Sequence, residues 1–323
     1  MKSFPQSQSA VNQRAARIIM IGALLLILTQ QITVAAPAPE TSKTFATPEE
    51  AANALLATVK THDPEALKSL FGPAVSDLEN PDRVQATNEL STFAIALEEK
   101  SQIVRESSSR YVLEVGTNEW PFPIPIALRE GRWLFDTAAG KEELLNRRIG
   151  RNELAVLEVM RAYVDAQRDY ASRDRDGDEV LEYAQRLSST PGTQDGLYWP
   201  LELWGEVSPL GPLVAHAQGE GYHLDEMENK EPPQAFHGYY FKIVTRQGKH
   251  AAGGKYDYII NGNMIGGFAM VAWPAEYGDS GVMTFIVNQQ GTVWQKDLGP
   301  KTQKLLSKLK EYDPDSTWER SPD

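Results

Sequence analysis

The sequence predicts an α+β protein in which helices precede an antiparallel sheet twice along the chain. Apolar residues recur at steps of three and four in segments 48–59 and 84–98, as they do on the buried face of a helix. The period then changes to two in segments 110–115 and 132–136, which is the alternation of half-buried strands. A long helix followed by strands returns in the second half, so we expect two α+β domains.

The composition bounds the function before any motif is considered. The chain has 323 residues, of which 41% are hydrophobic and 24% charged, and this excludes a wholly disordered protein. Acidic residues outnumber basic ones by 44 to 32, for a net charge of −12. This excess argues against nucleic acid as the main partner, because phosphate binding needs clustered cations. Cysteine is absent, which excludes disulfides, zinc–thiolate sites and cysteine nucleophiles.

Residues 1–35 are predicted to be a secretory signal peptide. Arg14 and Arg17 precede the apolar run 18–28, which is short of the roughly 20 residues that span a bilayer. Small residues follow, and we expect cleavage after Ala35. The mature protein would then be periplasmic or secreted, with no membrane span and a net charge of −15. The alternative is an uncleaved N-terminal anchor.

A linker at 36–44 leads into the first predicted domain, residues 45–150. Within it, prolines alternate with large apolar residues over 120–126, which predicts an edge strand or polyproline stretch because proline cannot donate to a ladder. Trp120 and Phe122 are candidates for a partner surface, and the alternative is a strand laid over the core. Opening helices followed by a curved meander resemble the cone-shaped fold of the nuclear-transport-factor-two-like superfamily.

The second predicted domain covers residues 151–300. Asn152 is expected to cap a helix that runs to about residue 172, and antiparallel strands follow from about residue 237. Asn261-Gly262 is the strongest short signal for a hairpin turn. Between the helix and the sheet, Tyr198 and Trp199 complete the candidate partner surface. Residues 301–323 are predicted to form a short helix and a polar tail.

An acidic loop after the long helix is the candidate metal site. Calcium binds about six to eight oxygen ligands, and four carboxylates lie close together in the sequence. They are Asp174, Asp176, Asp178 and Glu182. Their spacing does not fit an EF-hand loop, whether Asp174 is taken as its first position or Gly177 as its sixth. The four carboxylates nevertheless predict a structural Ca²⁺ site that ties the helix end to the loop. The alternative is a solvated helix end in which Arg173 and Arg175 neutralise the acids.

No catalytic residue is predicted. Residues 278–281, Gly-Asp-Ser-Gly, copy the residues around the nucleophile of trypsin-like proteases, but a triad also needs a histidine base and an orienting carboxylate. None of the histidines stands in the sequence context of that family, and a turn between two strands explains the same residues. A hydrolase of envelope polymers that uses Ser280, with His237 or an acidic pair as base, is the alternative function.

Two resemblances add to this interpretation. The second half looks like the globular domain of type II secretion pseudopilins, through segments 152–167, 182–184, 238–241, 272–274, 281–285 and 291–293. That likeness implies a helix packed on an antiparallel sheet. The whole mature chain resembles a bacterial exported family known as domain of unknown function 2950 (DUF2950), through segments 120–125, 148–154, 176–178, 196–199, 208–213 and 274–278.

The family resemblance implies an exported protein and no particular activity. Together with the absence of a catalytic constellation in the sequence, it favours a non-catalytic binding or assembly module of the cell envelope. Its partner would be an envelope protein or polymer. An accessory component of a secretion or pilus apparatus is a further alternative, because of the pseudopilin-like half.

Overall fold

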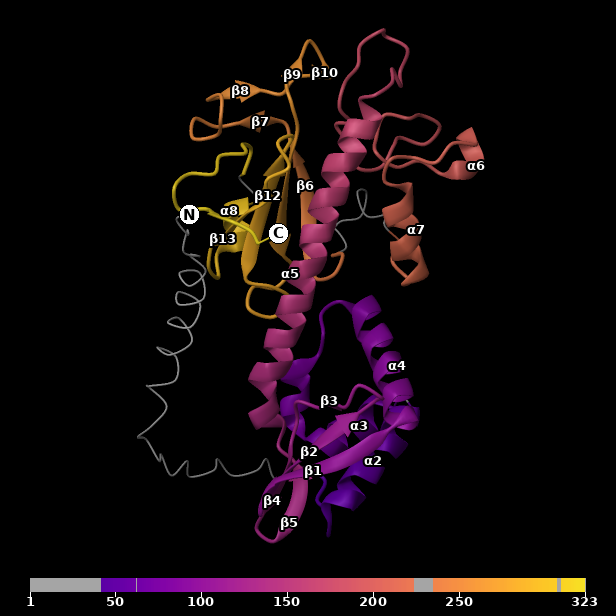
Figure 1. Ribbon diagram of the computed structural model, residues 1–323, viewed down its shortest axis with the longest axis vertical. Coiled ribbons are helices and arrows are strands. Elements are labelled where there is room, and N and C mark those ends of the chain that lie inside the picture. The colour runs from indigo at the N-terminus through magenta and orange to yellow at the C-terminus, as the bar shows by residue number, and fades with distance from the viewer. Residues whose placement is uncertain (1–41, 62, 224–234, 307–308, 323) are drawn as a thin grey trace, which may run out of the picture. The chain divides into compact units, whose positions relative to one another are not determined.

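The computed structural model describes residues 42–61, 63–223, 235–306 and 309–322 (Figure 1). The predicted signal peptide and residues 36–41 of the predicted linker lie outside the described residues. The described chain combines helices with antiparallel sheets, so the predicted α+β class is confirmed. In this part of the chain, none of the helices is both long enough and apolar enough to cross a bilayer.

Short helices open the described chain, and side-chain caps define where they start. They are α2 (Pro48–Thr61), α3 (Pro64–Phe71), the 3-10 helix η1 (Pro73–Leu78) and α4 (Arg83–Glu99). Thr47, Asp63 and Asp82 each accept a hydrogen bond from a backbone N–H in the first turn of α2, α3 and α4, respectively. The apolar spacing predicted helices at 48–59 and 84–98, and α2 and α4 begin at or within one residue of these segments.

The first sheet follows directly. Its strands are β1 (Ser101–Ser107), β2 (Arg110–Val115), β3 (Trp120–Pro121), β4 (Ile126–Arg129) and β5 (Arg132–Phe135). They pair antiparallel in the order β1-β2-β4-β5, with β3 also on β2. The sequence did not predict β1, because nearly all of its side chains are exposed and no alternation marks it. Helices and strands share a core that includes Leu55, Leu70, Leu97, Leu113 and Phe135.

Helix α5 (Thr137–Tyr170) is much longer than predicted. Its predicted start at Asn152 is wrong, because the helix begins where Asp136 accepts a hydrogen bond from the Ala139 N–H. Gly140 within this helix is required for packing, because a Cβ there would lie 2.8 Å from Ile124. The predicted domain boundary at residue 150 falls inside α5, and the division into two domains stays a prediction.

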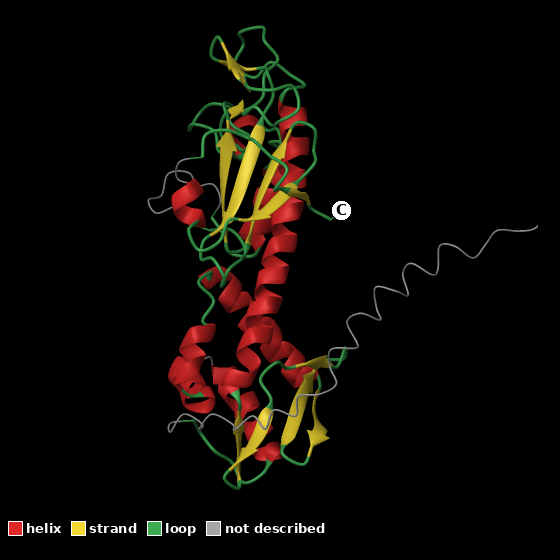
Figure 2. Ribbon diagram, turned by 90° about the vertical axis from the view of Figure 1, so that its left-hand side faces the viewer, coloured by secondary structure: helices red, strands yellow, loops and turns green. Residues whose placement is uncertain are grey.

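A second antiparallel sheet lies beside α5 (Figure 2). Its strands, in the order β14-β13-β12-β11-β6, are β14 (Glu319–Arg320), β13 (Trp294–Asp297), β12 (Met283–Asn288), β11 (Ala269–Pro274) and β6 (Tyr239–Val244). Tyr163 on α5 joins the two layers, since its ring meets that of Phe268 at 5.5 Å and its hydroxyl donates to the Ala269 carbonyl.

Smaller elements surround this sheet. They are α6 (Leu201–Trp204), α7 (Gly211–Gly219), α8 (Thr302–Leu306) and the strand pairs β7 (Arg246–Gln247) with β8 (Tyr256–Asp257) and β9 (Ile259–Ile260) with β10 (Asn263–Met264). The predicted Asn261-Gly262 turn joins β9 to β10. Both residues have positive φ, 54° and 98°, as a two-residue hairpin of this sequence requires.

Buried polar side chains on α5 connect it to distant segments. The Arg148 side chain, 7% exposed, forms an ion pair with Asp279 and donates to the backbone carbonyls of Leu78 and Glu79. One turn later, the fully buried Asn152 donates to the Ser280 carbonyl and accepts from Gln85. Buried polar groups of this kind are costly when unpaired, so these bonds fix the position of α5 against the chain at residues 78–85 and at residues 279–280.

Replacing Arg148 by alanine is therefore expected to destabilise the fold strongly. Loss of one partner of a buried ion pair costs about 3–5 kcal/mol, and two backbone carbonyls also lose their donor. Arg151→Ala is the matched control, because Arg151 is 58% exposed and pairs with Glu89, an interaction worth at most about 1 kcal/mol. Urea unfolding measures both variants, and equal effects would contradict the role given to Arg148.

Candidate functional site

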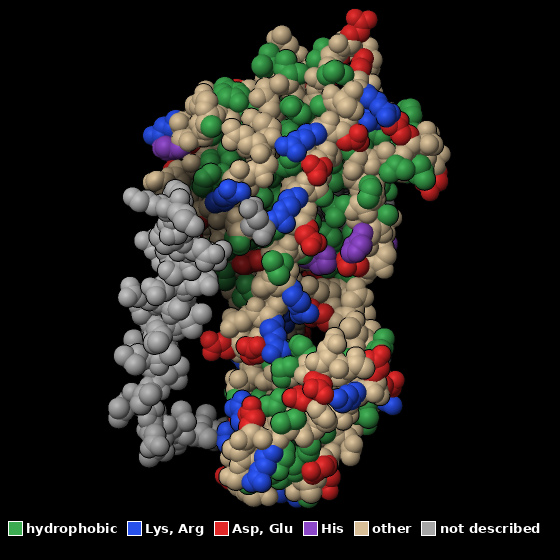
Figure 3. All heavy atoms as spheres, in the orientation of Figure 1, with side chains coloured by type: hydrophobic (Ala, Val, Ile, Leu, Met, Phe, Trp, Pro, Cys, Tyr) green, Lys and Arg blue, Asp and Glu red, His purple; other side chains and the backbone are tan. Residues whose placement is uncertain are grey.

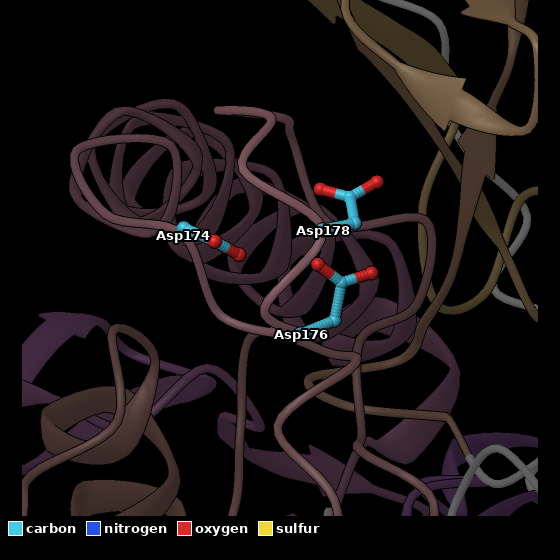
Figure 4. A group of neighbouring side chains, drawn as sticks. All are labelled: Asp174, Asp176 and Asp178. Atoms are coloured by element: carbon cyan, nitrogen blue, oxygen red, sulfur yellow. The ribbon is translucent and has the colours of Figure 1, made fainter.

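The acidic loop that follows α5 brings three of the predicted ligands together. Asp174, Asp176 and Asp178 are exposed, and each offers a carboxylate oxygen within 4.8 Å of the others. Figure 4 shows the three side chains on one turn of chain beyond the helix end. In the described part of the chain this is the one cluster of three or more His, Cys, Asp or Glu side chains with metal-ligand spacing.

Backbone hydrogen bonds shape this turn. Both oxygens of Asp174 accept from the chain, one from the Gly177 N–H at 2.7 Å and the other from the Glu179 N–H at 2.9 Å. These bonds lower the pKa of Asp174 below its usual value, since they stabilise the anion. Gly177 has a φ of 82°, a left-handed conformation that glycine adopts without strain. The local sequence thus dictates a turn that presents the three carboxylates together.

The neighbouring arginines do not neutralise the aspartates. Arg173 and Arg175 both pair with Glu206, at 2.7 and 3.2 Å. The Arg175 side chain is only 5% exposed and its guanidinium stacks over the ring of Trp199 at 5.1 Å. The alternative prediction that Arg173 and Arg175 neutralise the aspartates is therefore wrong. Among the described residues, no basic side chain forms an ion pair with any of the three aspartates.

Glu182, the fourth predicted ligand, lies outside this cluster. Its carboxylate accepts a hydrogen bond from the Met264 N–H at 2.8 Å and so holds the loop against β10. Asp178 reaches the same hairpin through the side-chain amide of Asn263. Burial raises the pKa of Glu182, and the charges of Asp176 and Asp178 raise it further.

A buried amide ties the same end of the loop back to α5. Gln167, in the last turns of α5, donates to the Ala184 carbonyl and accepts from the Ala184 N–H, both at 2.8 Å. Its side chain is fully buried and also donates to the Tyr163 hydroxyl. The end of the loop at residues 182–184 is therefore fastened both to α5 and to β10.

The predicted partner surface is only partly exposed. Trp120 is 40% exposed, but Phe122 and Trp199 are buried at 9% and 1%, so the expected exposure of these two residues is wrong. Phe122 packs among the rings of Phe71, Phe93 and Phe135, as expected for a strand laid over the core. Trp199 donates its indole N–H to the Glu206 carbonyl. A partner-binding role for the four residues stays a prediction.

An exposed apolar segment, which was not predicted from the sequence, follows immediately after Trp199. Leu201, Leu203, Trp204 and Val207 are each between 46% and 61% exposed. Hydrophobic side chains gather over α6 at the right-hand edge of Figure 3. The sequence carries a signal for this exposed segment, because its four apolar residues lie between Pro200 and Pro209 and are not spaced as on the buried face of a helix or strand.

Ser280 is placed as a turn residue. Its side chain is buried, and its hydroxyl donates to the Glu276 carbonyl and accepts from the Glu276 N–H. His237 instead faces Glu220, with the ring nitrogen 3.3 Å from the carboxylate, and burial lowers the pKa of His237. The Ser280 hydroxyl is thus hydrogen-bonded within its own turn, and the His237 ring is paired with Glu220.

The fold and the site define an α+β protein with a carboxylate cluster at a helix end. The chain matches the model of the family described as Protein of unknown function (DUF2950) over residues 42–321. It therefore belongs to that family, as its sequence resemblance implied. No curated protein and no solved structure matches the chain, and the pseudopilin-like and nuclear-transport-factor-two-like resemblances stay predictions.

Because the pKa of Glu182 is raised, we expect the effect of removing its charge on stability to depend on pH. Because its pKa is raised in the folded protein, the charged form costs stability at neutral pH, and that cost disappears as the pH falls through the folded pKa. Glu182→Gln removes the charge while keeping an oxygen that accepts from the Met264 N–H. In the absence of divalent ions, this variant is expected to melt slightly above the wild type at pH 7.

The stability gain of Glu182→Gln is expected to vanish at acidic pH, where Glu182 in the wild type is itself protonated. Thermal melting across this pH range measures it. Glu202→Gln, at an exposed position of α6, is the control for loss of one negative charge. A gain that is the same at both pH values, or the same in the control, would contradict the assignment to Glu182.

Proposed function

We propose that this protein is an exported, non-catalytic binding or assembly module of the cell envelope, in which a structural calcium ion stabilises the acidic loop. The observation that carries the calcium part is the approach of three carboxylates, none of them in an ion pair among the described residues, to within 4.8 Å in a loop whose end at residues 182–184 is fastened to α5 and β10. Like charges at this separation repel, and a divalent cation converts that repulsion into coordination.

The donor set fits calcium better than a softer metal. Asp174, Asp176 and Asp178 supply only carboxylate oxygens, which suit hard cations, whereas zinc and copper favour imidazole and thiolate. Three carboxylates from an exposed turn leave several of the about six to eight positions to water and backbone oxygens. We therefore expect weak binding, in the range of roughly 0.1–1 mM that is typical of extracellular calcium modules.

Calcium is expected to raise the melting temperature of residues 36–323. A ligand that binds only the folded state at ten times its Kd adds about 1.4 kcal/mol, which corresponds to roughly 2–5 °C for a chain of this size. Asp176→Asn/Asp178→Asn is expected to abolish the shift. Asp165→Asn/Asp169→Asn removes the same charge from exposed positions of α5 and is expected to retain it.

Melting in EDTA and in millimolar calcium, followed for the three proteins, measures these shifts. Equal melting of the wild type in both solutions would exclude a calcium site. A shift of the same size in the Asp176→Asn/Asp178→Asn protein would place the ion elsewhere.

Export and a partner in the envelope complete the proposal. Export is supported by the basic flank and short apolar run within residues 1–35. The binding role is supported by the exposed segment Leu201, Leu203, Trp204 and Val207, because clustered exposed apolar residues mark interaction sites.

One experiment tests both parts. The full chain, carrying a photo-crosslinking amino acid in place of Leu203, is expressed in a bacterial host and the cells are fractionated. We expect a mature protein that starts at Ala36, in the periplasm or medium, and a discrete cross-linked product from position 203. The same probe at Leu305, which is 52% exposed on α8, is the control. Cytoplasmic retention of the full-length chain would contradict export, and identical products from both positions would contradict the binding surface.

A further inference from the structure

A cavity of about 350 Å³ lies along the outer edge of β6. On one side it is lined by β6 and β11, and on the other by α5, α7 and the chain around residues 185–198. Its volume is at the lower end of the range of small-molecule pockets, about 300–1,000 Å³. Most of the lining is apolar, with contributions from Leu213, Val214, Phe241, Ile243 and Met270.

The cavity reaches round the edge of the sheet. Alternation along β6 puts Phe241 and Ile243 on the face toward α5, and Tyr240 and Lys242 on the opposite face. All four residues line the cavity, and β6 is the last strand of its sheet. The cavity therefore has an apolar interior beside α5 and a mouth beside Tyr240 and Lys242.

The free backbone of this edge is short. Tyr239 exchanges two hydrogen bonds with Phe236, and the Thr245 carbonyl accepts from the Tyr258 N–H. By the alternation of an antiparallel strand, the outward backbone groups between these two points belong to Phe241 and Ile243. A length of two outward residues is too short for a further strand to add, so the cavity suits a small molecule better than an extended peptide.

The charge of the lining selects the class of ligand. Among the described residues that line the cavity, Lys242 alone carries a charge and none is acidic, although the chain as a whole has 44 acidic residues against 32 basic ones. The Lys242 ammonium donates to the Leu309 carbonyl at 3.3 Å. Since an ammonium has three donors, two are left for an anionic group at the mouth.

From this arrangement we propose that the cavity binds a single-chain anionic amphiphile, with its apolar chain against Phe241, Ile243 and Met270 and its anionic head beside Lys242. Burial of the chain supplies most of the affinity, because the transfer of apolar surface out of water is favourable. The exposed lysine contributes orientation and discrimination by charge. This inference deepens the proposed binding role, on which it rests, and is independent of the calcium site.

Isothermal titration of residues 36–323 with sodium decanoate, below its critical micelle concentration, tests the proposal. We expect binding of decanoate and about fivefold or more weaker binding of decyltrimethylammonium, which has the same chain and the opposite charge. Lys242→Gln is expected to weaken decanoate binding about threefold, the effect of an exposed ion pair. Lys249→Gln, an exposed lysine outside the cavity, is expected to bind as the wild type does.

Filling the cavity is expected to remove binding. Ile243→Trp adds volume to the cavity wall, and Leu213→Trp does so from α7, so that one variant serves if the other fails to fold. Leu305→Trp, at an exposed position away from the cavity, is the control. Both cavity variants are expected to bind decanoate at least about tenfold more weakly than the control does.

Absence of decanoate binding to the wild type would overturn the proposal, as would full affinity in both filled variants. Equal binding of the two oppositely charged amphiphiles would overturn the choice of an anionic ligand. Calcium-dependent melting and cross-linking at position 203 are measured on Ile243→Trp as well. If these persist while decanoate fails to bind the wild type, only the cavity proposal is wrong.

Discussion

Buried polar side chains on one long helix hold together segments that are far apart in the sequence. Arg148 donates to carbonyls before α4 and pairs with Asp279, Asn152 links Gln85 to Ser280, and Gln167 holds Ala184. Apolar packing alone is non-directional and tolerates small shifts of a helix. A buried hydrogen bond does not, because a slipped helix would leave its donors unpaired in a medium of low dielectric. These contacts therefore set the register of α5, on which the acidic loop and the cavity both depend.

The acidic loop illustrates how such a register produces a site. Gln167 fixes the chain at Ala184, and Glu182 fixes it to β10 through Met264. Between the helix end and these anchors, Asp174 closes a turn with its own backbone partners. The backbone of the loop is thus held by the fold, and it brings the three carboxylates within 4.8 Å of one another.

Local signals predicted much of this structure, whereas long-range packing was beyond the sequence. The helix at 48–59 and the Asn261-Gly262 turn depend on a few neighbouring residues, and both were predicted. The first half of α5 was not predicted from the sequence, and the need for glycine at position 140 depends on the approach of Ile124. The cluster of aspartates follows from their spacing, but the burial of Trp199 and the pairing of both arginines with Glu206 depend on segments thirty residues apart.

Glu206 connects the acidic loop with the exposed apolar segment. It lies between Trp204 and Val207 and holds both Arg173 and Arg175, the two cations nearest to the aspartates in sequence. The Arg175 side chain is buried against Trp199, whereas the Arg173 side chain is 63% exposed. Because Glu206 holds both arginines, their charges form no ion pair with the aspartates. If the proposed calcium ion occupies the aspartates and the proposed partner binds the apolar segment, Glu206 is the group that both would influence, and by linkage that coupling would be reciprocal.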